Sequence, residues 1–414
     1  MNFAVIGLGF GDEGKGMVTN YLSSKFVDTF VVRYSGGPQA GHTVCTKNGF
    51  RHIFSNFGSG TLNATSTYWS ELCPIDPEAI VREKQVLFEK GFNPRLYIDN
   101  KCPVITPYDR IKNQNSSSDK LNGTCGIGFG ATIQREEDHY SLTAKDLFYA
   151  SVLGKKLSAI LQYHNFKVTY LDSTSGYQEH IAGFYDGSVT LEDDIVHFID
   201  AVHKITHDPM IHFVDDIPKA SNYIFEGSQG LMLDQDIGFF PHVTRSNTGT
   251  KNIKKMIDKM YERDDLDIHN AFTFTHFYLV TRAYQTRHGN GPMTGDELYT
   301  AINKNQKVSD VIKVDDRETN IAHPYQGEFR RGLLDLELLH YAIEKDGNLN
   351  KSNITLVITC LDHMPNDYPF VRNGKIKYHK SEKEFIAAIA AYLGIKKVLV
   401  SHSPYSSELE EFKI

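Results

Sequence analysis

Two glycine-rich loops, each preceded by a short apolar segment, constrain the fold of this chain more than any other feature of its sequence. The first follows a predicted strand at residues 3–6 and reads Gly7-Leu-Gly-Phe-Gly-Asp-Glu-Gly-Lys-Gly16. Because glycines tolerate backbone angles that side chains forbid, the N–H groups of such a loop can converge on an anion. Lys15 adds positive charge, whereas the carboxylates of Asp12 and Glu13 indicate a metal ligand or a general base. The loop is not a Walker A motif, since glycine rather than Ser or Thr follows the lysine.

The second loop follows an apolar segment at residues 30–32 and reads Ser35-Gly-Gly-Pro-Gln-Ala-Gly-His-Thr43. It brings an imidazole, that of His42, to the end of another predicted strand. A carboxylate from the first loop and this imidazole can flank one substrate as an acid–base pair on rigid strand ends. Alone, the first loop is explained equally well by a tight turn without a ligand. The second loop favours the acid–base site.

The segments Gly11-Asp-Glu-Gly-Lys-Gly16 and Ala40-Gly-His-Thr43 carry the most specific signal in the chain. Together they resemble two motifs of the adenylosuccinate synthetase family. The resemblance continues in the same order through residues 123–124, 225–230, 241–248, 286–292, 330–335, 359–362 and 401–404, so it covers nearly the whole chain. It implies one α/β domain over residues 1–414, with a mainly parallel central sheet and a P-loop-like GTP-binding fold.

For the nucleoside triphosphate, the resemblance implies GTP as co-substrate and Mg²⁺ as cofactor. Asp12 and the carbonyl group of Gly41 are the implied Mg²⁺ ligands. Asp362 is implied to recognise guanine, because a carboxylate accepts from guanine N1–H and the 2-amino group, a donor pair that adenine lacks. The residues implied to hold GTP are Gly11, Glu13, Gly14, Lys15, Gly16, Gly41, His42, Thr43, Asp362, Ser401 and Ser403.

For the second substrate, the resemblance implies a purine nucleotide and L-aspartate. The amide of Gln229 can both donate and accept toward the edge of a 6-oxopurine. The residues implied to bind these substrates are Asp12, Gln39, Thr124, Gln229, Thr244, Arg330 and Arg331, and the implied catalytic residues are Asp12, Lys15, His42 and Gln229. Glu328 and Phe329 stand where the family carries basic residues that grip aspartate. The amino donor is therefore the point at which this chain departs most from the family.

The reaction that the resemblance implies is a ligation of purine biosynthesis. GTP phosphorylates O6 of IMP, and the amino group of L-aspartate displaces the phosphate to give adenylosuccinate, GDP and phosphate. Pro38-Gln39 in place of the commoner His-Asn leaves open GMP or dGMP as the acceptor, with a 2-aminoadenylosuccinate product, and Glu328 leaves open another amine. A guanine-nucleotide-binding regulator without catalysis is the non-enzyme alternative. Intact Asp12, Lys15 and His42 argue against it, because a binding module needs no base.

Composition narrows the classes of partner. A net charge of −7 over 414 residues argues against nucleic acid as the main partner, although a local basic pocket for phosphates remains compatible with it. The five cysteines are scattered without zinc-type spacing, which predicts reduced thiols in a cytoplasmic protein. We expect no signal peptide and no membrane span, because no window approaches the roughly 20 apolar residues that a span requires. The resemblance implies a homodimer, although residues 136–140 lack the arginine with which the family completes the partner's site.

Periodicity and composition predict the remaining elements. Helices are predicted at residues 77–91, within 142–166 and at 195–205. Strands are predicted at 96–98, 222–225, 272–281, 354–359 and 397–400. Residues 113–119 are predicted to form a mobile polar loop, and residues 406–411 a polar tail.

Overall fold

A ten-stranded sheet forms the centre of the computed structural model, which describes residues 1–116, 124–165, 168–170, 179–181, 191–263, 271–313, 325 and 327–413. The strand order is β18-β17-β14-β11-β1-β10-β2-β5-β6-β9. Neighbouring strands are parallel except for the last pair at one edge, β17 and β18. The prediction of an α/β fold with a mainly parallel central sheet is confirmed. The strands are β1 (Asn2–Gly7), β2 (Thr29–Arg33), β5 (Ser66–Trp69), β6 (Leu96–Asp99), β9 (Ile211–Val214), β10 (Asn222–Gly230), β11 (His276–Arg282), β14 (Ile354–Thr359), β17 (Lys397–Val400) and β18 (Glu410–Phe412).

The central strands are buried along nearly their whole length because both faces of the sheet are covered. In β1, Ala4 and Ile6 pack into one hydrophobic core, while Phe3 and Val5 pack into another. This alternation follows from the two-residue period of a strand, which sends successive side chains to opposite faces. The core that contains Val5 also contains Val18 of helix α1 (Lys15–Ser23), so α1 covers that face beside the first glycine loop.

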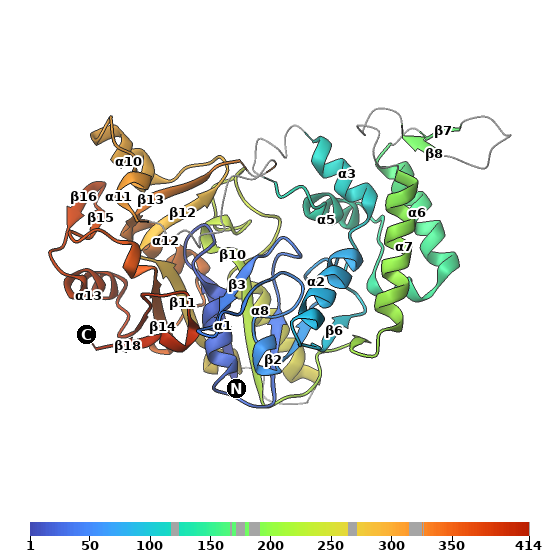
Figure 1. Cartoon of the computed structure of the whole chain (residues 1–414), viewed down its shortest axis with the longest axis horizontal. Helices are drawn as coiled ribbons and strands as arrows, with labels where there is room; N and C mark the ends of the chain where they lie inside the picture. Colours follow the sequence, from blue (N-terminus) through green and yellow to red (C-terminus); the bar gives the residue numbers. More distant parts are fainter. Residues whose placement is uncertain are drawn as a thin grey trace.

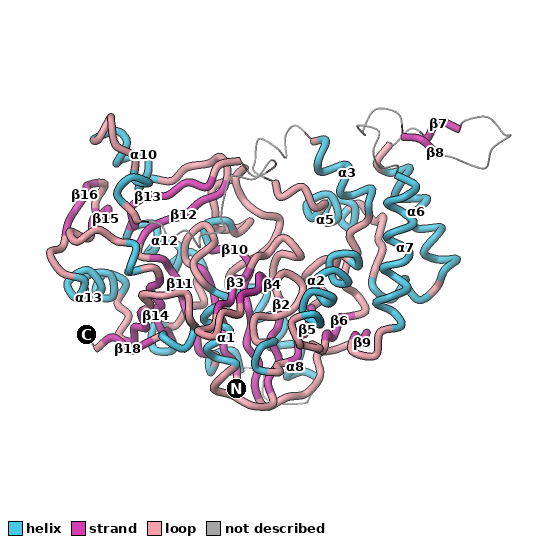
Figure 2. The backbone as a smooth tube through the Cα atoms, in the orientation of Figure 1, coloured by secondary structure: helices cyan, strands magenta, loops and turns pink. Residues whose placement is uncertain are grey.

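The other elements flank the sheet at its two ends (Figure 1). Helices α2 (Pro77–Glu89), α3 (Pro107–Asn115), α5 (Phe129–Glu137), α6 (Ala150–Tyr163) and α7 (Leu191–His207) gather near β6. A four-stranded sheet lies toward the other end, as the strands coloured magenta in Figure 2 show. It contains β12 (Tyr284–His288), β13 (Phe329–Asp335), β15 (Pro369–Arg372) and β16 (Lys375–Tyr378), near α10 (Thr294–Ile302), α11 (Val308–Val311), α12 (Leu336–Asp346) and α13 (Glu382–Leu393). Helix α8 (Thr250–Arg263) and the hairpins β3 (His42–Cys45) with β4 (Arg51–Phe54) and β7 (Val168–Tyr170) with β8 (Glu179–Ile181) complete the described α-helices and strands.

Several predicted elements differ from the structure at their ends. The strand predicted at residues 222–225 continues to Gly230, because the pairing of β10 with β2 reaches Glu226 and that with β1 reaches Gly230. The strand predicted at 272–281 begins only at His276, after a short 3₁₀ helix at Phe272–Phe274. The predicted polar tail at 406–411 was wrong, because β18 adds an antiparallel edge strand to β17. The polar run at 113–119 begins inside α3, and its residues 117–119 lie outside the described residues.

The carboxyl ends of the parallel strands gather the loops that the sequence singles out. The first loop follows β1, the second follows β2, and further loops follow β10, β11, β14 and β17. Parallel strands end at one edge of a sheet, which is where open α/β sheets bind ligands. The fold therefore collects these loops around one place.

Candidate active site

One cavity of about 1090 Å³ lies at this edge of the sheet. Ligand pockets commonly have volumes of about 300 to 1,000 Å³, so this cavity has the size expected for two substrates. Most of the predicted site residues line it: Gly11, Asp12, Glu13, Gly14, Lys15, Gly16, Gln39, Gly41, His42, Thr43, Thr124, Gln229, Thr244, Asp362 and Ser403. Ser401, Arg330 and Arg331 are not on its wall.

The first loop folds around one of its own carboxylates. Glu13 Oε1 accepts hydrogen bonds from the backbone N–H groups of Gly9 and Gly11, at 3.0 and 2.9 Å. Its other oxygen, Oε2, lies 2.7 Å from Lys15 Nζ, and both side chains are buried. The acceptor atoms of Glu13 are thus used within the loop, which leaves Asp12 as the carboxylate of this loop with capacity for a ligand.

Two threonines anchor the backbone of the same loop. Thr286 Oγ1 donates to the carbonyl of Gly11 at 3.0 Å, and Thr359 Oγ1 donates to the carbonyl of Glu13 at 2.8 Å. Gly14 then turns the chain into α1 with φ of 97°, a left-handed conformation that favours glycine. The unpaired N–H groups at the start of α1 lie directly after the loop, as in other phosphate-binding sites.

Asp12 is held through both its backbone and its side chain. Its φ is 62°, and its carbonyl accepts a hydrogen bond from Arg282 Nε. Its Oδ2 atom lies 3.3 Å from His288 Nε2. Burial acts to raise the pKa of the Asp12 carboxyl, but the hydrogen bond and charge of His288 and the charges of Arg282 and Lys15 outweigh it and lower the pKa. Asp12 is therefore ionised at neutral pH and can accept a proton.

His42 is buried against a carboxylate that the sequence reasoning did not select. Its Nδ1 atom lies 3.0 Å from Glu226 Oε1, and Glu226 Oε2 lies 3.9 Å from Arg33 Nη1. Burial lowers the pKa of His42 more than Glu226 raises it, so the unliganded imidazole is neutral at pH 7. An ionised carboxylate only accepts, which places the single ring proton on Nδ1. Donation from Nε2 to a ligand then needs a second proton, which the negative charge of a bound phosphate would favour.

The donor atoms at Asp12 fit a Mg²⁺ ion. Mg²⁺ prefers hard oxygen ligands and is commonly held by one or two carboxylates together with the phosphates of a substrate. Asp12 Oδ1 has no hydrogen-bond partner in the described part of the chain, so its two lone-pair sites can face a cation and a substrate proton, and Gly41 lines the same cavity. The described residues contain no group of three or more His, Cys, Asp or Glu side chains able to hold a metal, and a phosphate-assisted Mg²⁺ site does not need one.

Two glutamine amides line the cavity with unused polar atoms. Both Nε2 and Oε1 of Gln39 are buried without a hydrogen-bond partner among the described residues, and so is Oε1 of Gln229. Gln229 Nε2 lies 3.3 Å from Thr244 Oγ1, to which it donates. Buried polar atoms are costly when unpaired, so these amides indicate that a polar ligand completes them.

A glycine loop between α3 and α5 contributes the predicted phosphate-binding threonine. Thr124 Oγ1 donates to Asn113 Oδ1 at 2.9 Å, and the N–H of Gly128 donates to the same oxygen at 3.2 Å. Thr124 lines the cavity, whereas its neighbour Gly123 lies outside the described residues. Asn113 therefore holds both ends of the described part of this loop.

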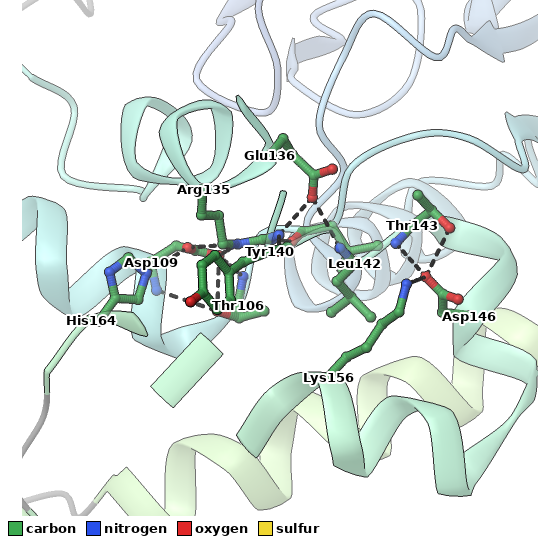
Figure 3. Close-up of polar contacts among 11 residues, drawn as sticks. Thr106, Asp109, Arg135, Glu136, Tyr140, Leu142, Thr143, Asp146, Lys156 and His164 are labelled. Carbon is green, nitrogen blue, oxygen red and sulfur yellow. Dashed lines mark hydrogen bonds and ion pairs between the residues drawn. The ribbon is translucent and has the colours of Figure 1, made fainter. Parts of the chain in front are cut away.

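Figure 3 shows the buried ion pair that fixes α3 against α5, between Asp109 and Arg135. Arg135 Nε lies 2.9 and 3.1 Å from the two oxygens of Asp109, and His164 Nε2 lies 3.0 Å from Asp109 Oδ1. Burial acts to raise the pKa of Asp109, but Arg135 and His164 lower it overall. The guanidinium group of Arg135 is thus used inside this lobe, and His139 nearby is exposed and does not line the cavity. The site of this chain has no cavity-lining arginine from residues 135–140 of its own.

The residues predicted to bind the guanine base separate into two groups. Asp362 and Ser403 line the cavity, and Asp362 is about a third exposed. Ser401 is fully buried, and its hydroxyl donates to the carbonyl of Ser403 at 2.6 Å. Ser401 therefore shapes the turn after β17 rather than the cavity wall.

The predicted aspartate grip is not assembled by its arginines. Arg330 donates from Nε and Nη2 to the carbonyls of Gly289 and Gly291, at 3.1 and 2.6 Å. The guanidinium group of Arg331 lies 5.5 Å from the centre of the Phe329 ring. Glu328 is exposed. Residues 321–324 and 326, which precede this group in the predicted amino-acid loop, lie outside the described residues.

The sequence reasoning missed several charged side chains of the site, among them Glu226, Arg33 and His288. Glu226 and His288 lie in motifs that it quoted. Glu226 lies in the middle of the buried strand β10, Arg33 is the last residue of the buried strand β2, and His288 is the last residue of β12. A charge inside an otherwise apolar strand is the signal that could have found the first two, because a buried charge needs a partner. No comparable signal marked His288.

The sequence comparisons converge on one family. The family model described as adenylosuccinate synthetase matches residues 4–408. Curated relatives of that name from Psychromonas ingrahamii and Pseudoalteromonas atlantica are each 30% identical, over 317 and 300 residues. These alignments cover 73% and 70% of this chain and 65% and 64% of the relatives. The chain thus spans just under two thirds of the length of the curated relatives that it matches.

Two solved structures share the fold. A fully ligated adenylosuccinate synthetase from Plasmodium falciparum superposes with a TM-score of 0.71 and 18% identity, covering 100% of both chains. The succinoaminodeoxyadenylate synthetase of cyanophage S-2L, bound to dGMP and to dATP as an energy donor, gives a TM-score of 0.60 and 14% identity, covering 99% of this chain and 94% of that one. At these identities the likenesses bear on the fold. Among the described residues, no helix has the length and apolar character needed to cross a membrane.

Proposed function

The chain belongs to the adenylosuccinate synthetase family, and we propose that it is a GTP-dependent ligase that joins an amino group to C6 of a purine nucleotide. One observation carries this proposal: Asp12, Lys15, His42 and Gln229 line a single cavity. A base, a cation, an imidazole and an amide in one place are the groups that the reaction requires.

In the first step, Asp12 removes the proton from N1 of a 6-oxopurine. The electron pair of the N1–H bond moves toward O6, and O6 attacks the γ-phosphorus of GTP as the bond to the leaving GDP oxygen breaks. Lys15 and the loop N–H groups that remain free stabilise the charge on the transferring phosphoryl group. Asp12 would also hold Mg²⁺ with the carbonyl of Gly41, and the ion would neutralise phosphate charge when bound.

In the second step, the amino group of the donor attacks C6 and loses a proton, the C6–O6 bond breaks, and inorganic phosphate leaves with O6. We propose IMP as the acceptor and L-aspartate as the donor. Gln229 holds the purine edge, and Thr124 and Thr244 hold the acceptor's phosphate. We further propose a homodimer, which light scattering on the purified protein tests.

A second acceptor, GMP or dGMP, is favoured by one observation. Gln39 Oε1 is a buried acceptor without a partner among the described residues, and a 2-amino group supplies an N–H donor that hypoxanthine lacks. This acceptor would give a 2-aminoadenylosuccinate. The cyanophage structure that shares the fold was bound to dGMP, which supports testing it.

The test measures phosphate release with Mg²⁺ and L-aspartate in a matrix of acceptors (IMP, GMP, dGMP) and triphosphates (GTP, ATP, dATP), with the product identified by mass spectrometry. Asp12→Asn is the inactive control. Asp258→Asn, which removes a surface carboxylate paired with Lys254 on α8, is the matched control for a general effect of charge. We expect adenylosuccinate from IMP and GTP, lost in the first variant and kept in the second.

Turnover with only GMP or dGMP would assign the second acceptor. Tight GTP binding without turnover of any acceptor, repeated with a panel of amines in place of L-aspartate, would instead support a nucleotide-binding regulator. Turnover with an amine other than aspartate would show that Glu328 marks a changed donor site.

A further inference from the structure

We propose that His288 is a positioning residue for the general base, donating from Nε2–H to Asp12 Oδ2 so that Oδ1 is the oxygen that takes the proton from N1. This inference rests on the proposed function, because it assigns a task to Asp12 in that reaction. It concerns a residue that belongs to neither glycine loop.

The contact itself is the first observation. His288 Nε2 lies 3.3 Å from Asp12 Oδ2, and the two side chains are 20% and 24% exposed at the cavity wall. Within the described part of the chain, His288 is the side chain in ion-pair contact with the Asp12 carboxylate, while Arg282 and Lys15 act on it through their charges. A carboxylate group with one oxygen held by a neighbouring donor has one preferred orientation, whereas a carboxylate group without such a contact can rotate about its bond to the side chain.

Strand β12 supplies both supports of this segment. Thr286 holds the carbonyl of Gly11, and His288, two residues farther along the strand, contacts the side chain of Asp12. Residues two apart on a strand project to the same face of the sheet. One face of β12 therefore contacts both the carbonyl of Gly11 and the side chain of Asp12. The arrangement ties the position of the carboxylate to the four-stranded sheet.

The imidazole is in turn held by packing. Phe329 is directly opposite His288 in the pairing of β12 with β13, and their ring centres are 4.7 Å apart. The guanidinium groups of Arg282 and Arg331 lie 5.9 and 5.5 Å from the centre of the same phenyl ring. Phe329 was marked as a departure from a basic position, and in the structure it forms the support of His288. Aromatic cross-strand pairs of this kind restrict ring orientation.

The buried second nitrogen of His288 indicates which proton the ring carries. Nδ1 is buried and has no hydrogen-bond partner among the described residues. Because the ionised carboxylate only accepts, the contact with Asp12 requires the proton on Nε2. Nδ1 then needs no acceptor.

The kinetic test compares two replacements of His288. His288→Phe keeps an aromatic ring against Phe329 and removes the donor, whereas His288→Gln keeps an N–H donor at a similar distance from the backbone. We expect kcat to fall about 10- to 100-fold in the Phe variant, the effect of losing a hydrogen bond to a charged group, with KM for both nucleotides changed by less than about threefold. The Gln variant should recover most of kcat. His340→Phe, which breaks a surface contact with Glu344 on α12, should match the wild type.

A second measurement does not depend on turnover. Long-range ¹H–¹⁵N spectra of protein labelled with ¹⁵N at its histidines report the tautomer of each imidazole ring. The set of signals that is missing from the spectrum of His288→Phe belongs to His288. We expect the Nε2–H tautomer for His288 in the wild type, and a change at that ring in Asp12→Asn.

The outcomes separate this inference from the proposed function. If the wild type converts no acceptor, the proposed function fails, and the spectra still test the contact. A His288 signal that is insensitive to Asp12→Asn would overturn the contact. Full kcat in His288→Phe, or a rise in KM with kcat unchanged, would overturn the positioning role.

Discussion

Replacing Glu226 with Gln tests how the neighbouring imidazole of His42 is held. Glu226 is fully buried on β10 and faces His42 and Arg33, and the N–H of Ser59 donates to Oε2 at 3.3 Å. Glutamine keeps the size of the side chain but removes its charge. Arg33, which is also fully buried, then has no counter-charge in contact, and the removal of one partner from a buried pair is strongly destabilising.

The size of this effect follows from the pKa of Glu226. Burial acts to raise it, but His42 and Arg33 lower it from the ordinary 4.5 to about 2. Because a tenfold change in acid dissociation is worth about 1.4 kcal/mol, the charged form contributes up to roughly 3 kcal/mol to the free energy of unfolding when His42 is protonated, and less at pH 7, where the imidazole is neutral. The pKa is lower in the folded state, so the part that comes from the ionisation of Glu226 is complete above pH 4.5 and disappears as the pH falls through about 2.

Urea unfolding of wild type and Glu226→Gln at pH 7 and pH 3.5 measures the difference directly. We expect Glu226→Gln to be less stable than the wild type by about 1 to 3 kcal/mol at pH 7, and by a different amount at pH 3.5 because acidification charges His42 and neutralises Glu226. The variant should also have a lower kcat because His42 loses its partner. Glu382→Gln is the matched control, since it breaks a surface carboxylate–imidazole contact with His402 and should cost less than about 1 kcal/mol. Equal stabilities at pH 7, or a gap that stays constant between the two pH values, would refute this account of the pair.

Three further substitutions test individual assignments. Asp12→Asn should lower turnover by at least about 100-fold, while its affinity for GTP, measured by calorimetry, should stay within a few-fold of the wild-type value. Retained activity would exclude Asp12 as the base. Asp362→Ala should raise KM for GTP about 10- to 100-fold and leave KM for ATP nearly unchanged, because only guanine donates two N–H groups to the carboxylate. An unaltered preference between GTP and ATP would exclude Asp362 from recognition of the base. Arg330→Ala should lower the free energy of unfolding by about 2 kcal/mol, since two backbone carbonyls lose a charged donor. An increase in KM for the amine at unchanged stability would instead show that Arg330 binds the amino donor.

The sequence predicted the loops of this site better than the partners within it. A glycine run after an apolar strand is a local pattern, and local patterns are visible in the sequence. The contact of Glu226 with His42 and Arg33 is not local, because β10 lies between β1 and β2 in the sheet although almost 190 residues of chain separate β2 from β10. The ends of β10 and β11 were misplaced for the same reason, since strand pairing rather than composition decides where they begin and end.

The adjacent carboxylates Asp12 and Glu13 show how the environment divides two similar groups. Both stand in a loop whose glycines can gather N–H groups around an anion, and the sequence offers no means to separate them. In the structure, Glu13 takes the N–H groups of Gly9 and Gly11 together with Lys15, so the loop is partly filled by an anion of its own. Asp12 receives one side-chain contact and keeps one oxygen without a partner among the described residues. A carboxylate that is ionised at neutral pH and has unused acceptor capacity can accept a proton or a cation. Asp12 is therefore the carboxylate of this loop that can act in the reaction, while Glu13 maintains the shape of the loop.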